Sequence, residues 1–330
     1  MSQVQLTGRG QRPALRLVET KDLSREDWLS VRKNGIGGSD AAAAVGLHPY
    51  MSALELWLDK TGRAEGMPRP DPDDTTSPTY WGTLLEPIVA ASYTKQTGNR
   101  VRRVNAVLRH PAIPWMLANV DREVVGCRDV QLLECKTAGE FGARLWREGV
   151  PEYVQIQVQH QLAVTGKQAA HVAVLLCGQA LEVFLIGRDD GLIARLIELE
   201  ARFWKYVETD TPPPADGSES ADRALRHLYP GHGGTVNFTG DVRLSSVFAD
   251  LVAVRVEIEA RQTIEAQLKQ TIQHAMGDAT RAMFETGEVS FKRSKDSSTV
   301  DLKRLLVDHP EFETRYAIPK SGSRRFLVST

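Results

Sequence analysis

The order of apolar segments in the middle of the chain constrains the fold more than any other feature. Strand-like runs come first, a helical segment follows, and further strand-like runs complete the series. They span residues 100–110, 115–126 and 130–138, then 149–166, then 170–178 and 180–188. Strands and helices mixed in this order pack as layers around a sheet. The order therefore predicts an α/β (α+β) fold, with a central mixed sheet of about five strands flanked by helices.

Helical segments with recognisable ends lie on both sides of this region. Ser24 precedes an acidic first turn, and Ser52 and Glu55 have capping-box spacing. Pro87 is expected to start a turn or to kink its helix. The expected helices span 24–34, 39–46, 52–62, 81–98 and 189–208, and a Pro- and Asp-rich loop spans 63–79.

Beyond a proline-rich segment, the tail has a helical pattern of its own. Apolar residues recur at three- and four-residue spacing, at Val247, Leu251, Val254 and Ile258 and again at Ile264, Leu268 and Ile272. This spacing predicts a long amphipathic helix, with a coiled-coil hairpin arm as an alternative, and a small β/α end after it. The predicted division is an N-terminal arm (1–22), a core (23–208), a linker (209–220) and a C-terminal helical appendage (221–330).

Composition limits the setting in which the chain works. The three cysteines lack the spacing of a disulfide framework or a zinc site, which fits a reducing, cytoplasmic environment. We find no apolar run long enough to span a membrane, and the first residues lack the apolar core of a signal peptide. A net charge of −1 argues against a general polyanion binder, but it allows a local basic surface around an acidic centre.

A carboxylate and an ammonium group stand together in a run that otherwise has the composition of a buried strand. In QLLECKTA, Glu134 and Lys136 are two residues apart and point to the same side of a strand. Asp121 lies on the preceding strand, and a hairpin would bring it beside Glu134. Glu86, on an upstream helix, is a candidate for a third carboxylate. The alternative is a surface hairpin with a structural Glu–Lys pair.

This pattern fits phosphodiester hydrolysis. Asp121 and Glu134 would hold Mg²⁺, with two ions expected and Mn²⁺ as a substitute, and the backbone carbonyl of Cys135 is a further ligand candidate. Lys136 would orient or deprotonate the attacking water and neutralise developing charge. Gln155, Gln157, Gln159 and Gln161 alternate along the next helix, where Gln157 and Gln161 share a face, so part of this series is expected to reach the site.

The ordered motifs GIGGSD, WG…LE, NVD, LLECKT and QIQVQHQL resemble the YqaJ/phage lambda exonuclease branch of the PD-(D/E)XK nucleases, over about residues 24–208. The resemblance implies a restriction-endonuclease-like core and Mg²⁺-dependent 5′→3′ digestion of one strand of linear double-stranded DNA, leaving 3′ overhangs. It also implies a single-strand annealing protein as partner, a phage or prophage origin and a ring-shaped homotrimer. By motif, Glu86, Asp121 and Glu134 become the acidic site residues, Lys136 the catalytic lysine and Gln157 the assisting glutamine.

The resemblance assigns Arg32 and Ser39 to a 5′-phosphate site, and GIGGSD has a physical basis for that role. The start of a helix presents free N–H groups to an anion, and Gly37 and Gly38 would let a phosphate approach the backbone. Asp40 would repel a phosphate, so its side chain is expected to turn away, either to cap the helix or to pair with a lysine. The alternative is that GIGGSD only turns the chain and caps a helix.

Two other functions remain as alternatives to an exonuclease. One is a structure-specific or CRISPR-adaptation-type endonuclease of the same superfamily; the iron–sulfur version of the latter is excluded because it needs four cysteines. The other is a catalytically silent adaptor that acts through its coiled-coil arm. Intact Asp121, Glu134 and Lys136 favour an enzyme over the adaptor.

Overall fold

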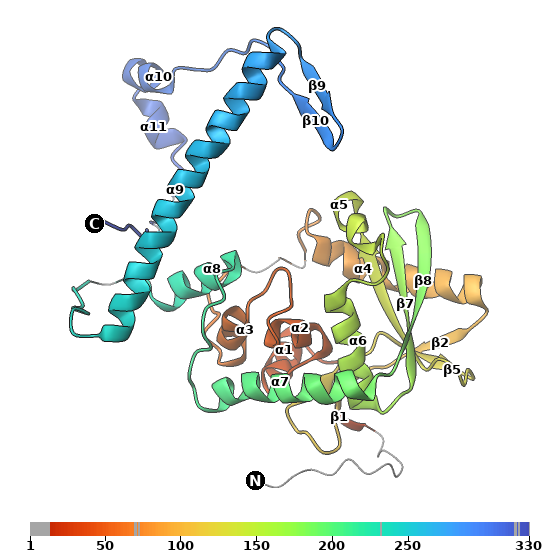
Figure 1. The fold of residues 1–330 in the computed structure, drawn as a ribbon. Helices are drawn as coiled ribbons and strands as arrows, with labels where there is room; N and C mark the ends of the chain where they lie inside the picture. Colours follow the sequence, from red (N-terminus) through yellow and green to blue (C-terminus); the bar gives the residue numbers. More distant parts are fainter. Residues whose placement is uncertain are drawn as a thin grey trace. The chain divides into compact units, whose positions relative to one another are not determined.

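The structure is a computed structural model that describes residues 14–68, 71, 73–231, 233–319, 322 and 324–329. Within these residues the chain forms two compact units (Figure 1). The first, called the core unit here, ends at Pro230, and the second, the tail unit, begins at Gly231. Residues 1–13 of the predicted N-terminal arm lie outside the described residues.

A five-stranded mixed sheet lies at the centre of the core unit, in the order β2-β5-β6-β7-β8. Its strands are β2 (Arg100–Arg103), β5 (Arg122–Val125), β6 (Leu132–Ala138), β7 (Ala169–Leu176) and β8 (Ala180–Gly187). Neighbours run antiparallel, except that β6 and β7 are parallel. The predicted mixed sheet of about five strands is therefore confirmed.

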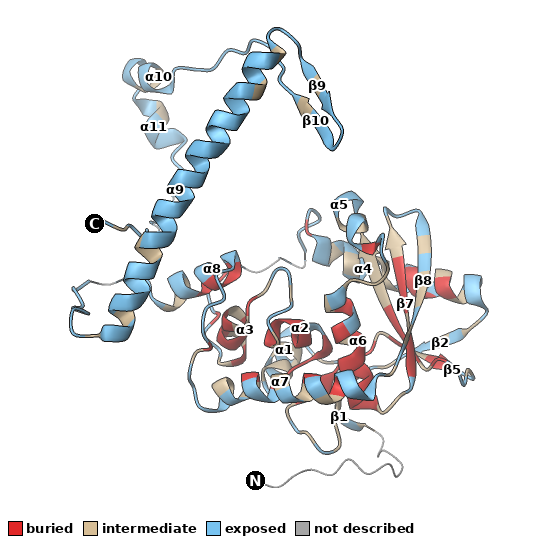
Figure 2. Ribbon diagram, viewed as in Figure 1, coloured by how far each residue is buried: buried red, intermediate tan, exposed pale blue. Residues whose placement is uncertain are grey.

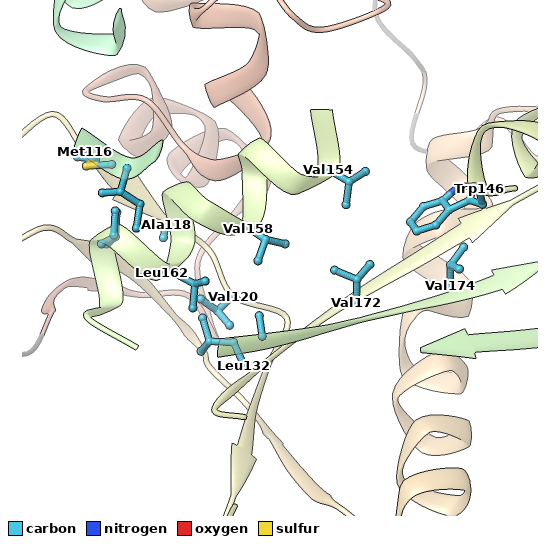
Figure 3. Packing of buried hydrophobic residues seen from close by; sticks show 14 residues of the cluster. Met116, Ala118, Val120, Leu132, Trp146, Val154, Val158, Leu162, Val172 and Val174 are labelled. Carbon is cyan, nitrogen blue, oxygen red and sulfur yellow. The ribbon is translucent and has the colours of Figure 1, made fainter. Parts of the chain in front are cut away.

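Helices cover both faces of this sheet, as the apolar runs predict. On one face, Leu132 of β6 packs in a cluster with Val158 of helix α6 (Glu152–Thr165) (Figure 3). On the other face, the next residue, Leu133, packs with Val89 of helix α4 (Pro78–Thr97). This is the two-residue alternation of a strand that is buried on both sides. Helix α4 runs through Pro87 without ending there.

The parallel pair β6 and β7 requires a crossover connection, since parallel strands cannot be joined by a tight turn. The crossover contains short helix α5 (Glu140–Ala143), the 3-10 turn η1 (Arg144–Trp146) and α6. Helix α6 thus returns the chain across the sheet at the carboxyl end of β6. That position brings its side chains over the end of the strand that carries Glu134 and Lys136.

A second, three-stranded sheet in the order β1-β3-β4 was not anticipated. It consists of β1 (Leu15–Glu19), β3 (Ala106–Arg109) and β4 (Leu117–Ala118). Each of the runs 100–110 and 115–126 is split, so that its two halves join different sheets. Residues 15–19, expected to lie in a loose arm, instead pair with β3 as a short and mostly exposed strand.

The helices α1 (Arg25–Lys33), α2 (Gly38–Ala44), α3 (Ala53–Lys60), α7 (Asp190–Glu208) and α8 (Glu219–Leu228) complete the core unit. Their shared apolar cluster contains Leu54, Trp57, Phe203 and Ala224, and it appears as buried segments in Figure 2. Ser220 of α8 is buried, and its hydroxyl accepts the backbone N–H of Ser52 at 2.8 Å.

The stretch 209–220, predicted as a linker, therefore runs into a helix that packs on α3, and the compact unit continues to Pro230. Small apolar residues on one side of α8 make this packing possible, although the segment is polar overall. Where the functional domain boundaries lie stays a prediction.

The tail unit is built around one helix, α9 (Val242–Met276), followed by β9 (Arg281–Phe284), β10 (Gly287–Ser290), α10 (Leu302–Asp308) and α11 (Glu311–Arg315). Helix α9 is unbroken over 35 residues, so the predicted long helix is confirmed and its hairpin alternative is wrong. Strands β9 and β10 form an antiparallel hairpin. Among the described residues, no helix in either unit combines the length and apolarity needed to cross a membrane.

Candidate active site

The β5–β6 hairpin places Asp121 beside Glu134, as predicted. Arg122 lies opposite Leu133 and Glu123 opposite Leu132, so the next residue of each strand continues the register and Asp121 meets Glu134. The carboxylate of Asp121 also accepts the backbone N–H of Cys135 at 2.8 Å. This hydrogen bond ties the loop before β5 to β6 at the point where the strand leaves the core.

Lys136 and Gln157 complete a closed network with Glu134. The Lys136 ammonium lies 2.7 Å from Glu134 Oε1 and donates to Gln157 Oε1 at 2.9 Å, while Gln157 Nε2 donates to the same Glu134 oxygen at 2.6 Å. The three side chains thus hold one another in place. Of the alternating glutamines, Gln157 is the one that contacts the lysine, as the resemblance implies.

Gln161 is a further site residue, which helical spacing predicts only as a neighbour of Gln157 on the same face. It is buried, and its Nε2 donates both to Glu134 Oε2 at 2.8 Å and to the Asn119 carbonyl at 3.1 Å. Both oxygens of Glu134 are therefore held by amide donors from α6. The four-residue spacing between Gln157 and Gln161 is the signal that predicts this arrangement.

The electrostatics of the cluster are dominated by burial and by the closeness of two carboxylates. Burial, and then the charge of Glu134, raise the pKa of Asp121 to about 8. Burial alone would lower the pKa of Lys136, but the charges of Glu134 and Asp121 outweigh it and raise that pKa above the ordinary value. Lys136 is therefore a protonated donor, and its charge offsets only part of the increase in the pKa of Asp121.

The side chain of Cys135 packs on the opposite side of β6, in the apolar cluster between the sheet and α4, as expected for a residue that alternates with Glu134 and Lys136. Burial raises the pKa of its thiol, so the side chain is a neutral packing group. Only its backbone is positioned near the carboxylates, and the role of its carbonyl as a ligand stays a prediction.

Glu86 does not join Asp121 and Glu134 as the predicted third carboxylate of one cluster. Its Oε1 accepts from Arg122 at 2.5 Å and lies 3.9 Å from an Arg103 nitrogen. Across the described residues, no group of three or more His, Cys, Asp or Glu side chains is arranged to hold a metal ion. The arginine next to Asp121 is the reason, because it draws the Glu86 carboxylate into an ion pair.

The GIGGSD segment forms the N-terminus of α2, with a charged network around it. Arg32 donates to the Ser39 hydroxyl and to Asp40, at 2.7 Å in each case. Asp40 takes both of the roles expected for it, as a cap and as the partner of a lysine. Its carboxylate caps the helix by accepting the Gly37 N–H at 3.0 Å, and it pairs with the buried Lys60 at 2.6 Å.

The paired cations also fix the charge state of Asp40. Burial alone would raise the pKa of this carboxyl, but Arg32 and Lys60 hold it well below its usual range. Asp40 is therefore an anion whose charge is already neutralised. Lys60 was not identified by sequence, since nothing in ALELWLDK marks its lysine as buried.

Gly38 joins the two halves of the site. A Cβ at this position would lie 3.1 Å from the Gln161 Cγ and 3.4 Å from the Gln157 Cγ, because the first turn of α2 packs directly on α6. The closeness of the two helices thus depends on a residue without a side chain. The end of α2 and the carboxylate cluster are parts of one surface, which the separate motifs do not show.

A buried ion pair joins α6 to α7. His160, fully buried, lies with Nδ1 2.7 Å from Glu200 Oε1 of α7 and with Nε2 2.8 Å from the Leu117 carbonyl of β4. Burial favours the neutral ring, but Glu200 outweighs it and raises the pKa of His160. Because both ring nitrogens face oxygen acceptors, the imidazolium is the form that satisfies both.

The donor set fits a hard divalent cation. Asp121 and Glu134 offer carboxylate oxygens, the ligand type that Mg²⁺ and Mn²⁺ prefer. Burial, and then the neighbouring charge of Glu134, raise the pKa of Asp121 and disfavour its ionised form, and a bound dication would offset both effects. This chemistry supports a metal site at the carboxylate pair, with Glu86 held outside the first ligand set.

Comparisons with known proteins cover the part of the chain that contains this site. A family model described as a YqaJ-like viral recombinase domain matches residues 27–168. The protein YqaJ of Bacillus subtilis (strain 168) is 34% identical over 301 residues, covering 89% of this chain and 91% of that protein. Among solved structures, an alkaline exonuclease (LHK-Exo) from Laribacter hongkongensis matches 56% of this chain and 93% of its own, with 24% identity and a TM-score of 0.47. A phage related exonuclease from Haemophilus somnus 129PT matches 53% and 94%, with 14% identity and a TM-score of 0.37.

Proposed function

The chain belongs to the YqaJ-like viral recombinase family, and from that premise we propose that it is a metal-dependent 5′→3′ exonuclease acting on linear double-stranded DNA. One observation carries the proposal: the carboxylate–lysine–glutamine cluster lies against the N-terminus of α2, with Gly38 packed on Gln157 and Gln161. Such a surface offers a hydrolytic centre beside a place for a terminal phosphate. That combination favours cutting from an end.

Asp121 and Glu134 would hold Mg²⁺, with Mn²⁺ as a substitute, and the Cys135 carbonyl is the further ligand candidate. Two ions are expected, because one cation site on two carboxylates leaves the leaving oxygen without a partner. When bound, divalent ions polarise the scissile phosphate and lower the pKa of the attacking water. Glu86 would act through water, since Arg122 holds its carboxylate.

Lys136 is a donor rather than a base in this mechanism. Its raised pKa keeps the ammonium protonated, so it neutralises charge that develops on the phosphate and orients the water. Gln157 fixes the position of the ammonium through its Oε1, and Gln161 fixes the second oxygen of Glu134. The two glutamines thus keep the carboxylate and the lysine at a constant distance before substrate arrives.

Direction would be read at the first turn of α2. A 5′-phosphate would accept from free backbone N–H groups there and from Arg32 and Ser39, which already share a hydrogen bond. Asp40 does not oppose this anion strongly, because Lys60 and Arg32 neutralise it. Digestion from this end would leave a 3′ single strand, the substrate expected for a single-strand annealing partner.

The proposal is tested with end-labelled linear duplexes that carry either 5′-phosphate or 5′-hydroxyl ends. We expect Lys136→Ala to lose activity on the order of a hundredfold or more and still to bind DNA ends. Lys167→Ala is the matched control, because Lys167 is a surface lysine paired with Glu123 at 3.3 Å on the same sheet.

The direction of digestion is tested with Arg32→Ala and Ser39→Ala. Both variants should slow digestion of 5′-phosphorylated ends much more than of 5′-hydroxyl ends. If Lys136→Ala digested DNA at the wild-type rate, Glu134 and Lys136 would be a structural ion pair without a catalytic role. Efficient cutting of closed circular DNA would identify an endonuclease. If Arg32→Ala and Ser39→Ala kept the wild-type preference between 5′-phosphate and 5′-hydroxyl ends, the first turn of α2 would not be the phosphate site.

A further inference from the structure

Helix α9 of the tail unit carries an apolar stripe that the described chain leaves largely exposed. In the part of the chain that the structure describes, no residue of α9 is buried. Val254, Ile258 and Leu268 remain 52%, 50% and 62% exposed. Large side chains left exposed along one line of a helix mark a surface that pairs with another helix.

The stripe follows a heptad repeat with a charged interruption. The seam positions, spaced alternately by four and three residues, are Val247, Leu251, Val254, Ile258, Arg261, Glu265, Leu268, Ile272 and Ala275. Apolar residues at every seam position except two define a coiled-coil face. The two exceptions, Arg261 and Glu265, are consecutive and of opposite charge, and they lie near the middle of the helix.

These two charges determine how a second copy of the helix would fit. If two copies run antiparallel about a twofold axis at Thr263, Arg261 of each lies opposite Glu265 of the other. The same register puts Ile258 opposite Leu268 and Val254 opposite Ile272. Leu251 and Ala275 also face each other, and Val247 lies beyond the overlap of the two helices. Within the overlap, every apolar layer is thus matched by an apolar layer, and each charge by its opposite.

Other arrangements of two α9 helices are worse. A parallel, in-register pair would set Arg261 against Arg261 and Glu265 against Glu265, with both repulsions in the seam. An antiparallel pair shifted by one heptad would place both Arg261 and Glu265 against apolar residues, without a partner charge. Arg261 and Glu265 therefore disfavour the parallel and the shifted pairs more strongly than the apolar residues do. In this way, charges in the seam specify the orientation of the two helices.

The surface of α9 has a hollow where this pairing needs one. It is lined by Val254, Glu257, Ile258, Arg261, Gln262 and Glu265, of which the first four are consecutive seam and flanking positions. Four residues in this pattern form the hole that receives one seam side chain from the facing helix. In the register about Thr263, the side chain that reaches this hole is Leu268 of the second copy.

Flanking charges would extend the central pair into a network. Within one helix, Arg261 lies 3.8 Å from Glu257 and Lys269 lies 2.7 Å from Glu265. Pairing would join these as Glu257–Arg261–Glu265–Lys269 across the two copies. Arg255 would lie near Lys269 of the second copy, but this repulsion is at the solvated flank and is weak.

We propose that α9 is a homodimerisation helix, which pairs with α9 of a second copy of this chain as an antiparallel coiled coil centred on Thr263. The partner is a second copy because the charge pattern is complementary to itself under a twofold rotation, as an isologous interface requires.

The test compares the full-length chain with matched variants by light scattering and sedimentation over a range of concentrations. Val254→Asp buries a charge in the seam and should weaken association on the order of a hundredfold or more. Val256→Asp makes the same change two residues away, on the outer side of the helix, where Val256 is 62% exposed, and should leave the mass unchanged. Equal masses for these two variants would overturn the proposal.

Orientation is tested by charge reversal. Arg261→Glu should weaken the dimer by placing like charges together, and the double change Arg261→Glu/Glu265→Arg should restore it. A double variant as weak as the single one would show that these residues do not meet.

Cysteine cross-linking gives a second measure of orientation, in a Cys177→Ser background because Cys177 is exposed. A mixture of Val254→Cys and Ile272→Cys chains should form a mixed disulfide. Val254→Cys alone should not, since its two copies would be about 27 Å apart at 1.5 Å per residue. Cross-linking of Val254→Cys with itself would indicate parallel helices and overturn the antiparallel register.

Discussion

Loss of the ion pair between His160 and Glu200 should destabilise the core unit by an amount that depends on whether one partner or both are removed. His160→Leu leaves Glu200 fully buried with no cation, and one of its oxygens, Oε2, has no hydrogen-bond partner even in the intact pair. Breaking a buried pair in this way costs about 3–5 kcal/mol. That is a large part of the about 5–15 kcal/mol that stabilises a typical domain.

Removing both charges should cost much less than removing one. His160→Leu/Glu200→Leu replaces the pair by apolar groups of similar volume, so the double variant should be more stable than His160→Leu alone. The matched control is the surface pair of Arg195 and Glu198, with side chains 59% and 62% exposed, whose removal should change stability by less than about 1 kcal/mol. Additive costs for His160 and Glu200 would refute the reasoning.

Urea unfolding followed by tryptophan fluorescence measures this effect in the core unit alone. All six tryptophans of the chain precede Gly231, where the tail unit begins. The assay therefore reports the unit that contains His160 and is not sensitive to changes confined to α9. The slope of free energy against urea concentration should be the same in all variants if their unfolded states are alike.

The contribution of this pair should also depend on pH in a definite direction. The pKa of His160 is raised above its ordinary value of 6.5, because the charge of Glu200 outweighs burial; the Leu117 carbonyl and the charge of Asp40 add to the increase. A raised folded-state pKa means that the stabilisation is fully present below about pH 6.5 and is lost as the pH rises through the folded value. The difference in stability between wild type and the double variant should therefore shrink above neutral pH, and a difference that grows with pH would contradict the assignment.

The other predictions concern the site directly. Gly38→Ala should lower the rate of digestion about tenfold or more, because the added methyl displaces the glutamines behind it, whereas Gly139→Ala enters open space and should have little effect in the same assay. Gln161→Ala, which leaves a buried Glu134 oxygen unpaired, should slow digestion on the order of tenfold, while Gln155→Ala on the exposed side of α6 should match wild type in single-turnover measurements. Chelation with EDTA should abolish digestion and Mn²⁺ should restore it, and full cleavage in EDTA would be incompatible with a metal mechanism.

The parts of the site predicted from sequence are those governed by short-range geometry. The two-residue period of a strand places Glu134 and Lys136 on one side, and hairpin register places Asp121 beside them. The helical period does the same for Gln157 and Gln161. The apolar runs, for the same reason, predicted the mixed sheet and its covering helices.

What the sequence did not predict depends on partners distant in the chain. The pairing of Lys60 with Asp40 and of Arg122 with Glu86 arises from packing between elements, and no local sequence pattern predicts it. The split of two strand-like runs between two sheets depends on β1, which alternation alone identifies poorly. The docking of α8 is similar, since Ala224 becomes a core residue only because α3 and α7 present an apolar surface to it.

The contact between the first turn of α2 and helix α6 has a consequence for the size of each product. Two helices in direct contact at Gly38 hold the first turn of α2 and the carboxylates at a fixed spacing, with no flexible loop between them. On the proposed function, that spacing acts as a ruler measured from the 5′ end of the strand. The enzyme would then release products of one uniform length whatever the base sequence, and the length would be set by the thickness of two packed backbones.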